Sequence, residues 1–410
     1  MPVSAGTVQL APVAVALTPN ATAEASLSVE TIVDPAAFAG LRDEWSRLLE
    51  ASHADNLFLT WEWLYTWWTH LAGARRLAIL TVRRGTRLLA IAPFAANGRS
   101  LLGASKLTFL GTGRVGSDYL DVIVRDGAVQ DAIPRLASHL IRRGATIDMR
   151  QVRITASTGS ELARELRRSG CPVRVTRTHR CPFIDLGGGS WEAYLGSLGS
   201  EHRYNFQRRF RKLATQHQLR FERVSSEQRR RELLPVLFEL HRLRWSERGG
   251  SDGLDGPGIR DFHEDLTRLA LERGWLRLFV LWLGGSPAAA LYGFRYGRVF
   301  SFYQSGLDPQ YRKLSVGLVA MGLTIKSAIE EGAAEFDLLH GEEAYKSHWA
   351  KKTRGLGRIV AYPAGPLGWL WWRGAAAVEV ARGLLHKLPR GMAAGISAGR
   401  GRGSHAAPAR

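Results

Sequence analysis

Hydrophobic positions recur at helical spacing early in the chain. After Asp34, the apolar side chains of the segment AAFAGLRDEWSRLLEA stand three or four residues apart: Phe38, Leu41, Trp45, Leu48 and Leu49. This spacing places them on one face of a helix, and an aspartate directly before such a run is a common N-cap. We therefore predict a helix here, and a second one over the tryptophan-rich segment WEWLYTWWTHL that follows.

The pattern then changes to short β-rich runs, which predict a hairpin and its later repetition. The stretch Arg76–Arg99 lies without gaps against Trp275–Arg298. After each hairpin come a strand, a helix and a strand with an inner aspartate, Asp148 or Asp337. Helices mixed with mostly antiparallel strands do not fit a doubly wound parallel fold. We predict an internally duplicated α/β (α+β) chain in which each unit is a mixed sheet flanked by helices.

Composition separates the two ends of the chain from its middle. A chain of 410 residues is long enough for two ordinary domains. Residues 1–28 lack the basic start of a secretory signal and predict a disordered leader. We expect an N-terminal domain over 29–180, a C-terminal domain over 181–362 and a basic, tryptophan-containing tail over 363–410.

The cysteines and apolar runs indicate the compartment. Cys171 and Cys181 show neither a metal-ligand spacing nor a disulfide framework, so we expect free thiols and no metal. Apolar stretches are interrupted well before the roughly 20 residues that a membrane span needs. We predict a cytoplasmic protein. The tail, with seven Lys and Arg against Glu379, could lie peripherally on the inner membrane face through its Trp and Leu side chains, or could be disordered at its end.

The formal net charge of +19 attracts anionic partners without identifying them. The segment SEHRYNFQRRFRKLATQHQLRFERV concentrates this charge, and Arg208 and Arg209 lie at its centre. A solvated helix face explains it, and so does a platform for an anionic substrate or for the phosphates of coenzyme A. Nucleic acid is a weaker alternative, because few aromatic residues are interleaved and no named nucleic-acid motif appears. We do not predict nucleic-acid binding.

The loop YRKLSVG stands where a strand gives way to a helix. Helix starts leave backbone amides free to bind phosphate oxygens, and ordinary helix capping is the alternative explanation. The arrangement suits a pyrophosphate. Its predicted cofactor-binding residues are Arg312, Lys313, Ser315, Val316, Gly317 and Leu318.

The segment from Ser301 to Ala350 resembles the acetyltransferase family named for the cellulose-biosynthesis proteins CelD and BcsL, also described as BioF2-like. The resemblance rests on a tyrosine-containing strand, a Gly-x-Asp-Pro turn, an Arg, a Ser-x-Gly helix start and the pattern Phe-Asp-x-x-x-Gly-x-x-x-Tyr-Lys. These are Tyr303, Gly306, Asp308, Pro309, Arg312, Ser315, Gly317, Phe336, Asp337, Gly341, Tyr345 and Lys346. Val316 stands where Pro is common. The resemblance covers roughly residues 29–362.

This resemblance implies two tandem domains of the GNAT (Gcn5-related N-acetyltransferase) type, an arrangement shared with the FemABX peptidoglycan transferases. The second domain would bind acetyl-CoA or another acyl-CoA along the strand FSFYQSGL, which adds Tyr303, Gln304 and Ser305 to the cofactor residues. The implied activity is transfer of an acyl group to an amine or hydroxyl, in polysaccharide or cell-envelope biosynthesis.

Acyl transfer needs a base for the acceptor's proton and a donor for the departing thiolate. The base candidates are Asp337, Glu342, Glu343, His340 and His241. Asp337 could equally anchor its strand, and a lone histidine is more often structural than catalytic. Through the resemblance, Tyr345 and Lys346 become candidates for returning the proton or stabilising charge. We predict Asp337, Tyr345, Lys346 and His241 as catalytic residues.

The acceptor site is predicted from three places in the chain. Arg208 and Arg209 come from the basic segment, and Arg244 and Trp245 come from the phrase LHRLRW that the resemblance includes. The loop LGTGRVGSDYLD has the glycines and polar groups of a substrate-binding loop, from which we predict Asp118 and Tyr119. Two rival functions stay open. One is FemABX-like transfer from aminoacyl-tRNA, and the other is a non-catalytic accessory role in an exopolysaccharide or cellulose synthesis complex.

Overall fold

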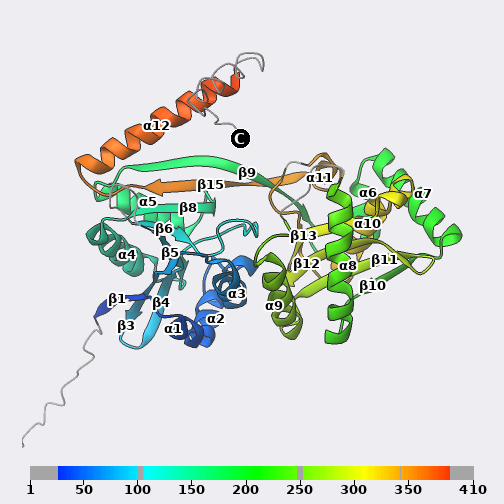
Figure 1. Cartoon of the computed structure of the whole chain (residues 1–410), viewed down its shortest axis with the longest axis horizontal. Helices are drawn as coiled ribbons and strands as arrows, with labels where there is room; N and C mark the ends of the chain where they lie inside the picture. Colours follow the sequence, from blue (N-terminus) through cyan, green and yellow to red (C-terminus); the bar gives the residue numbers. More distant parts are fainter. Residues whose placement is uncertain (1–25, 99–104, 247–252, 342, 388–410) are drawn as a thin grey trace, which may run out of the picture.

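The computed structural model describes residues 26–98, 105–246, 253–341 and 343–387, and Figure 1 shows their arrangement. The elements before residue 170 are β1 (Leu27–Ile32), α1 (Pro35–Gly40), α2 (Arg42–Glu50), η1 (Leu57–Leu59), α3 (Trp61–Leu71), β2 (Arg76–Leu77), β3 (Ile79–Arg84), β4 (Arg87–Ala92), β5 (Phe94–Asn97), β6 (Lys106–Phe109), β7 (Ile123–Val124), α4 (Val129–Arg143), β8 (Thr146–Arg153) and α5 (Thr158–Arg168). Most of the expected leader lies outside the described residues.

The later elements are β9 (Val173–Asp185), α6 (Trp191–Ser197), α7 (Ser200–Gln216), β10 (Arg220–Arg223), α8 (Glu227–Ser246), α9 (Ile259–Glu272), β11 (Leu276–Leu283), β12 (Ser286–Tyr296), β13 (Val299–Leu307), η2 (Pro309–Leu314), α10 (Val316–Glu330), β14 (Glu335–Asp337), α11 (Ala344–Trp349), β15 (Lys352–Ala361) and α12 (Pro366–Lys387). The end of the expected tail and Glu342 lie outside the described residues.

The first predicted helix forms as two consecutive helices. Asp34 caps α1 by accepting hydrogen bonds from the amides of Ala36 and Ala37. The chain bends at Leu41, and α2 then continues the buried apolar face with Trp45. The second prediction is confirmed as α3, which covers the predicted segment.

Within the described residues the strands form two sheets. A small sheet has the order β1-β3-β4-β7, and a large one runs β10-β11-β12-β13-β14-β9-β15-β8-β6-β5-β2. The long antiparallel pair of β9 and β15 crosses from one half of the molecule to the other (Figure 1). The boundary expected between residues 180 and 181 falls inside β9, and β15 returns to pair with β8. The large sheet is therefore continuous across that position.

The two halves repeat one strand arrangement. In the first half β6 pairs in parallel with β8, and Thr108 lies opposite Asp148. In the second half β13 pairs in parallel with β14, and Ser301 lies opposite Asp337. In each half the preceding strand, β5 or β12, pairs antiparallel on the other side. Mixed sheets flanked by helices confirm the predicted fold class.

Aromatic packing joins the halves, and Trp63 of α3 is central to it. Its indole is fully buried and donates a hydrogen bond of 2.8 Å to the hydroxyl of Ser117. The ring also meets Phe262 of α9 and Tyr303 of β13 edge-on, at centroid separations of 5.5 and 5.6 Å. Buried aromatic pairs of this geometry stabilise an interface beyond their area alone.

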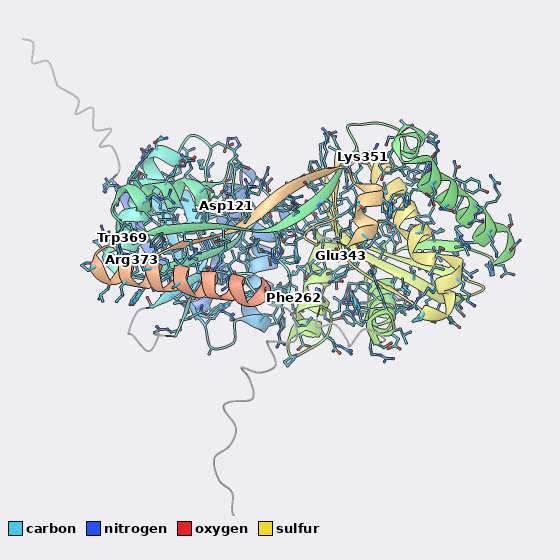
Figure 2. The ribbon with its side chains drawn as sticks, turned by 90° about the horizontal axis from the view of Figure 1, so that it is seen from above. Asp121, Phe262, Glu343, Lys351, Trp369 and Arg373 are labelled. Carbon is cyan, nitrogen blue, oxygen red and sulfur yellow. The ribbon has the colours of Figure 1, made fainter. Side chains whose placement is uncertain are left out.

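The last helix, α12, starts beside the end of β15 and runs back on the same side of the molecule as the β9–β15 pair, diverging from it along its length (Figures 1 and 2). Trp369 and Arg373 are near its beginning, and Leu367, Trp369 and Leu370 are exposed. No helix among the described residues is both long enough and apolar enough to cross a bilayer.

Candidate functional site

Beyond Ser301, β13 separates from β14. Only three residue pairs join the strands in parallel, after which β14 ends at Asp337 while β13 continues to Leu307. On its other side β13 carries a bulge, because Tyr292 pairs with Gln304 and Gly293 with Phe302. Tyr303 is the extra residue, and a bulge bends its strand. A cavity of about 190 Å³ lies where the strands diverge, and we call it the splay cavity.

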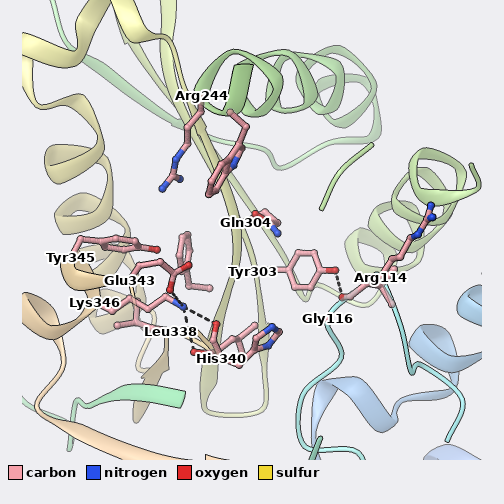
Figure 3. A pocket seen from close by; sticks show the side chains of 14 residues that line it. Arg114, Gly116, Arg244, Tyr303, Gln304, Leu338, His340, Glu343, Tyr345 and Lys346 are labelled. Atoms are coloured by element: carbon pink, nitrogen blue, oxygen red, sulfur yellow. Dashed lines mark hydrogen bonds and ion pairs between the residues drawn. The ribbon is translucent and has the colours of Figure 1, made fainter. Parts of the chain in front are cut away.

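Both halves of the chain line the splay cavity (Figure 3). Its walls come from β13, the loop after β14, the end of α8, α11 and the first-half loop that was predicted to bind substrate. The residues are Phe302, Tyr303, Gln304, Leu338, Leu339, His340, Arg244, Trp245, Glu343, Tyr345, Lys346, Arg114, Val115 and Gly116. The hydroxyl of Tyr303 donates to the carbonyl of Val115, which fixes the first-half loop against β13.

The loop after β14 is held in a demanding backbone conformation. Leu339 has a φ of +55°, a region that costs free energy for a residue with a branched side chain. The Asp337 carboxylate accepts from the Leu339 amide at 2.8 Å. Lys346 donates to the carbonyl of His340 at 2.9 Å and pairs with Glu343 at 3.0 Å. At Gly341, φ is +126° and a Cβ would approach Lys346 Nζ to 2.8 Å. These contacts fix the loop that presents His340.

His340 is bound by an aspartate from the other half of the chain. Asp118, which is fully buried, accepts from the His340 backbone amide at 2.8 Å and lies 2.8 Å from the ring Nδ1. A carboxylate can only accept here, so Nδ1 carries a proton and Nε2 of the neutral ring does not. The hydrogen bond to Asp118 raises the pKa of His340 although burial opposes the shift. The pair has the geometry of an oriented general base.

Asp337 and Tyr119 meet on another side of this loop. The Tyr119 hydroxyl donates to Asp337 Oδ2 at 2.7 Å, and both side chains line a second cavity of about 290 Å³ at the joint of the two halves. Burial raises the pKa of Asp337 to about 6, against the lowering effect of Arg354. Asp337 is not among the residues that line the splay cavity.

Arg244 and Tyr345 extend toward the splay cavity from α8 and α11 (Figure 3). Burial raises the pKa of Tyr345 to about 12, so its hydroxyl keeps its proton at neutral pH. Arg244 donates to the hydroxyl of Ser305 on β13. The predicted residues Tyr303, Gln304, Arg244, Trp245, Tyr345 and Lys346 are therefore brought together.

The predicted pyrophosphate residues lie at the far end of β13, where the chain passes through η2 into α10. Ser315 has a φ of +57° directly before the helix and makes no side-chain capping bond to it. Arg209 of α7 donates to the Lys313 carbonyl at 3.1 Å, so the basic segment reaches this turn. Arg208 instead stacks on Tyr204 at 5.7 Å.

His241 is buried in α8 beneath β13 and does not line the splay cavity. Burial lowers the pKa of its imidazole to about 4. A Cβ at Gly306 would lie 2.3 Å from the His241 amide nitrogen, so glycine permits the close approach of α8 and β13.

A third cavity, of about 330 Å³, adjoins the splay cavity and shares Gly116 and His340 with it. Its other lining residues come from the first-half loop and from β8, β9 and β15: Thr112, Gly113, Ser117, Arg150, Gln151, Thr178, His179 and Arg358. Across the described ranges, no group of three or more His, Cys, Asp or Glu could hold a metal ion.

Several site residues escaped the sequence analysis. His340 was weighed as a base, but nothing in the sequence paired it with Asp118, which is 222 positions away. Arg114 carried a weak signal as part of a glycine-containing loop, whereas Arg150 and Arg358 carried none because they lie on ordinary strands.

One family model matches part of the second half. Residues 200–347 match the family model described as "Acetyltransferase (GNAT) domain". The predicted acyltransferase is confirmed at this level, and the finer resemblance to the CelD and BcsL proteins stays a prediction. No curated protein matches the chain.

Solved structures share the fold at low identity. FemX is 13% identical with a TM-score of 0.56, over 77% of this chain and 95% of that one. A conserved protein of unknown function from Bacteroides thetaiotaomicron is 11% identical with a TM-score of 0.52, over 82% of this chain and all of that one. The C-terminal domain of a lysylphosphatidylglycerol synthetase candidate from Agrobacterium fabrum is 10% identical with a TM-score of 0.50, over 80% and 92%. At these identities the likeness concerns the fold alone.

Proposed function

We propose that this GNAT-type acyltransferase takes its acyl group from acyl-CoA, with acetyl-CoA as the first candidate, and binds the thioester in the splay cavity. The divergence of β13 from β14 carries the proposal. An unpaired strand edge offers backbone donors and acceptors to an extended ligand, and the pantetheine arm has amides that can pair with them. Gln304 and Ser305 lie on this edge.

The turn at the start of α10 would receive the pyrophosphate. Val316 and Gly317 begin the helix, where amides and the helix dipole favour phosphate oxygens, and Leu318 follows in the same turn. Arg312 and Lys313 add positive charge directly before it. Arg209 supports this turn from α7, which agrees with the expected role of the basic segment.

The residues around the splay cavity suit acyl transfer. Once the thioester is held beside an amine or hydroxyl, positioning supplies much of the rate. Tyr345, still protonated at neutral pH, can donate to the departing thiolate, and the bulged backbone at Tyr303 can stabilise charge on the carbonyl oxygen. The contacts of Asp337 and Lys346 favour a positioning role for both, through the loop that carries His340. His241 is buried outside the splay cavity and reaches it only through Gln304, which lines it.

The acceptor would be an amine or hydroxyl of a sugar or an envelope precursor, in keeping with the resemblance to cellulose-biosynthesis proteins. Trp245 and Arg114 line the splay cavity, and both can contact such a molecule. Asp118 and Tyr119 would affect the acceptor indirectly, because Asp118 binds His340 and Tyr119 binds Asp337.

Calorimetric titration with acetyl-CoA and a longer acyl-CoA tests the donor. The double variant Arg312→Ala, Ser315→Trp should lose at least about tenfold in affinity, because charge is removed and the helix start is covered. Lys326→Ala is the matched control, since Lys326 pairs with Glu330 farther along α10. Absence of acetyl-CoA binding to the wild type would overturn the proposal.

Transfer of an aminoacyl group from tRNA is the second candidate, favoured by the FemX-like fold and by the basic helix α7. Its test is the same wild-type protein titrated with aminoacyl-tRNA at two salt concentrations. Binding of aminoacyl-tRNA without binding of acetyl-CoA would establish this candidate in place of the first.

Peripheral membrane contact through α12 is supported by its exposed Leu367, Trp369 and Leu370 and by the basic tail that contains it. The protein should sediment with vesicles of anionic lipid, and truncation after Pro363 should abolish this. Equal sedimentation of the truncated protein would exclude the tail as the contact.

A further inference from the structure

The third cavity begins where the splay cavity ends. Both cavities are lined by Gly116 and His340. A Cβ at Gly116 would lie only 3.2 Å from the His340 ring, so glycine lets the first-half loop approach the imidazole. The His340 side chain keeps about a third of its surface accessible. A molecule in the third cavity would therefore meet the thioester at His340.

The third cavity carries an excess of positive charge. Arg150, Arg358 and Lys106 all pair with Asp148, at 3.1, 2.6 and 2.6 Å. One carboxylate thus faces three cations, and two of them, the arginines, line the cavity. The His179 ring lies 5.1 Å from the His340 ring on the same wall. Guanidinium groups bind carboxylate and phosphate oxygens through paired donors.

A hydroxyl group is also available in this cavity. Thr112 Oγ1 is buried and has no hydrogen-bond partner within the part of the chain that the structure describes. A buried hydroxyl without a partner costs free energy that a bound ligand can recover.

We propose that the third cavity binds an acceptor through a phosphate or carboxylate group, and that His340, oriented by Asp118, takes the proton of the acceptor's amine or hydroxyl. This inference rests on the proposed acyl-CoA donor. Arg150 and Arg358 bind the oxyanion, His340 is the catalytic base, and Asp118 is a positioning residue. The acceptor class is accordingly a molecule with both a nucleophilic amine or hydroxyl and an oxyanion.

The reaction balances with these groups alone. As the acceptor nitrogen or oxygen attacks the thioester carbonyl carbon, its proton passes to Nε2 of His340. The tetrahedral intermediate then collapses, the C–S bond breaks, and the thiolate takes the proton of Tyr345. Transfer from the imidazolium back to Tyr345, directly or through water, restores both residues and leaves acylated acceptor and free CoA.

The test follows the imidazole resonance of His340, assigned with His340→Gln, while inorganic phosphate or succinate replaces chloride at constant ionic strength. Bound oxyanion should raise the pKa of His340 and shift its resonance. Other charged and titratable groups also surround this ring, and they are the same in the chloride and oxyanion samples of the wild-type protein. They are Asp118, Arg150, His179, Glu343, Lys346 and Arg358.

Arg358→Gln should weaken the oxyanion response at least about tenfold, the loss typical of a charge-assisted pair, and Arg150→Gln gives a second measurement if the first variant does not fold. Arg177→Gln on β9, which lines none of these cavities, should respond like the wild type. A response to phosphate alone or to succinate alone identifies the acceptor's anion.

No oxyanion response in the wild type, or an undiminished response in both arginine variants, would overturn the inference. An acetyl-CoA titration of the same sample separates the two proposals. Acetyl-CoA binding without an oxyanion response rejects only the acceptor cavity, and an oxyanion response without acetyl-CoA binding rejects the donor.

Discussion

The two halves of the chain share one strand arrangement, but they surround its buried aspartate with different partners. Asp148 and Asp337 occupy equivalent places, opposite Thr108 and Ser301 in parallel pairs of three residues. Burial alone would raise the pKa of Asp148, but hydrogen bonds from Arg358, Lys106 and Arg150 outweigh it and hold the pKa well below its usual value. Asp337 accepts hydrogen bonds from the Tyr119 hydroxyl and the Leu339 amide. Burial outweighs the lowering effect of these bonds and of Arg354, and the pKa of Asp337 is raised.

Three residues farther along, the halves differ again. Gln151 and His340 occupy equivalent places, and both hydrogen-bond to the same oxygen of Asp118, at 3.2 and 2.8 Å. An amide cannot accept a proton at neutral pH, whereas an imidazole can. Both halves therefore place a side chain against Asp118, but only the side chain of the second half can accept a proton. The comparison teaches that the two halves differ at this place in one side chain, Gln151 or His340, and that both are held by Asp118 from a first-half loop.

Replacing His340 with the residue of the first half should have the largest effect. His340→Gln keeps a donor to Asp118 but removes the base, so turnover should fall about 100-fold or more while acetyl-CoA affinity stays within about twofold. Thiol release from acetyl-CoA measures it, with the fastest acceptor from a panel of amino sugars, sugar phosphates and amino acids. Turnover at the wild-type rate would remove His340 from the mechanism.

The equivalent aspartates should differ in stability. Asp148→Asn leaves three cations without their carboxylate, and because these cations are partly exposed the free energy of unfolding at pH 7 should drop by about 2 kcal/mol, less than for a fully buried pair. Asp337→Asn keeps an acceptor for the Leu339 amide and should lose little. Urea titration of both variants checks this, and an equal loss in both would contradict the difference between the halves.

Asp118→Asn should separate two effects of Asp118 on the His340 imidazole, its orientation and its pKa. The carboxylate is the main cause of the raised pKa of His340, and activity that needs the neutral imidazole rises with pH through that pKa. In the variant the acidic limb of the kcat profile should move to lower pH, and its plateau should fall because the ring loses its fixed tautomer. An unmoved limb would assign the titration to another group.

The smallest effect concerns the pH dependence of stability. Because the folded-state pKa of Asp337 is raised to about 6, this side chain holds a proton in the folded protein that it has lost in the unfolded chain, so its contribution to stability falls as pH rises from about 4 to 6. Asp337→Asn should remove this contribution, so the stability of the variant should rise more, or fall less, between about pH 4 and 6 than that of the wild type; the contributions of Asp121 and of His241, whose lowered pKa acts in the opposite direction, stay unchanged. Urea midpoints across this range measure it. A slope identical to the wild type would place the Asp337 pKa near its ordinary value.

The amino-acid sequence by itself determined the local elements and their repetition. Helical spacing after Asp34 gave the first helices, apart from the bend at Leu41, and the hairpin alignment placed Asp148 and Asp337 in equivalent strands. The helix start at Val316 was also evident. These features depend on side-chain periodicity and turn residues within a few positions, which a sequence displays directly.

Only the tertiary structure decided which of the candidate groups meet. Asp118 and His340, or Arg150 and Arg358, lie on different halves or about 200 positions apart, and no spacing rule connects them. The same holds for Asp337, whose contacts come from Tyr119, Arg354 and its own loop and not from the splay cavity. A sequence shows which side chains can carry charge or protons, but their distances and their pKa values depend on burial and on partners that folding brings together.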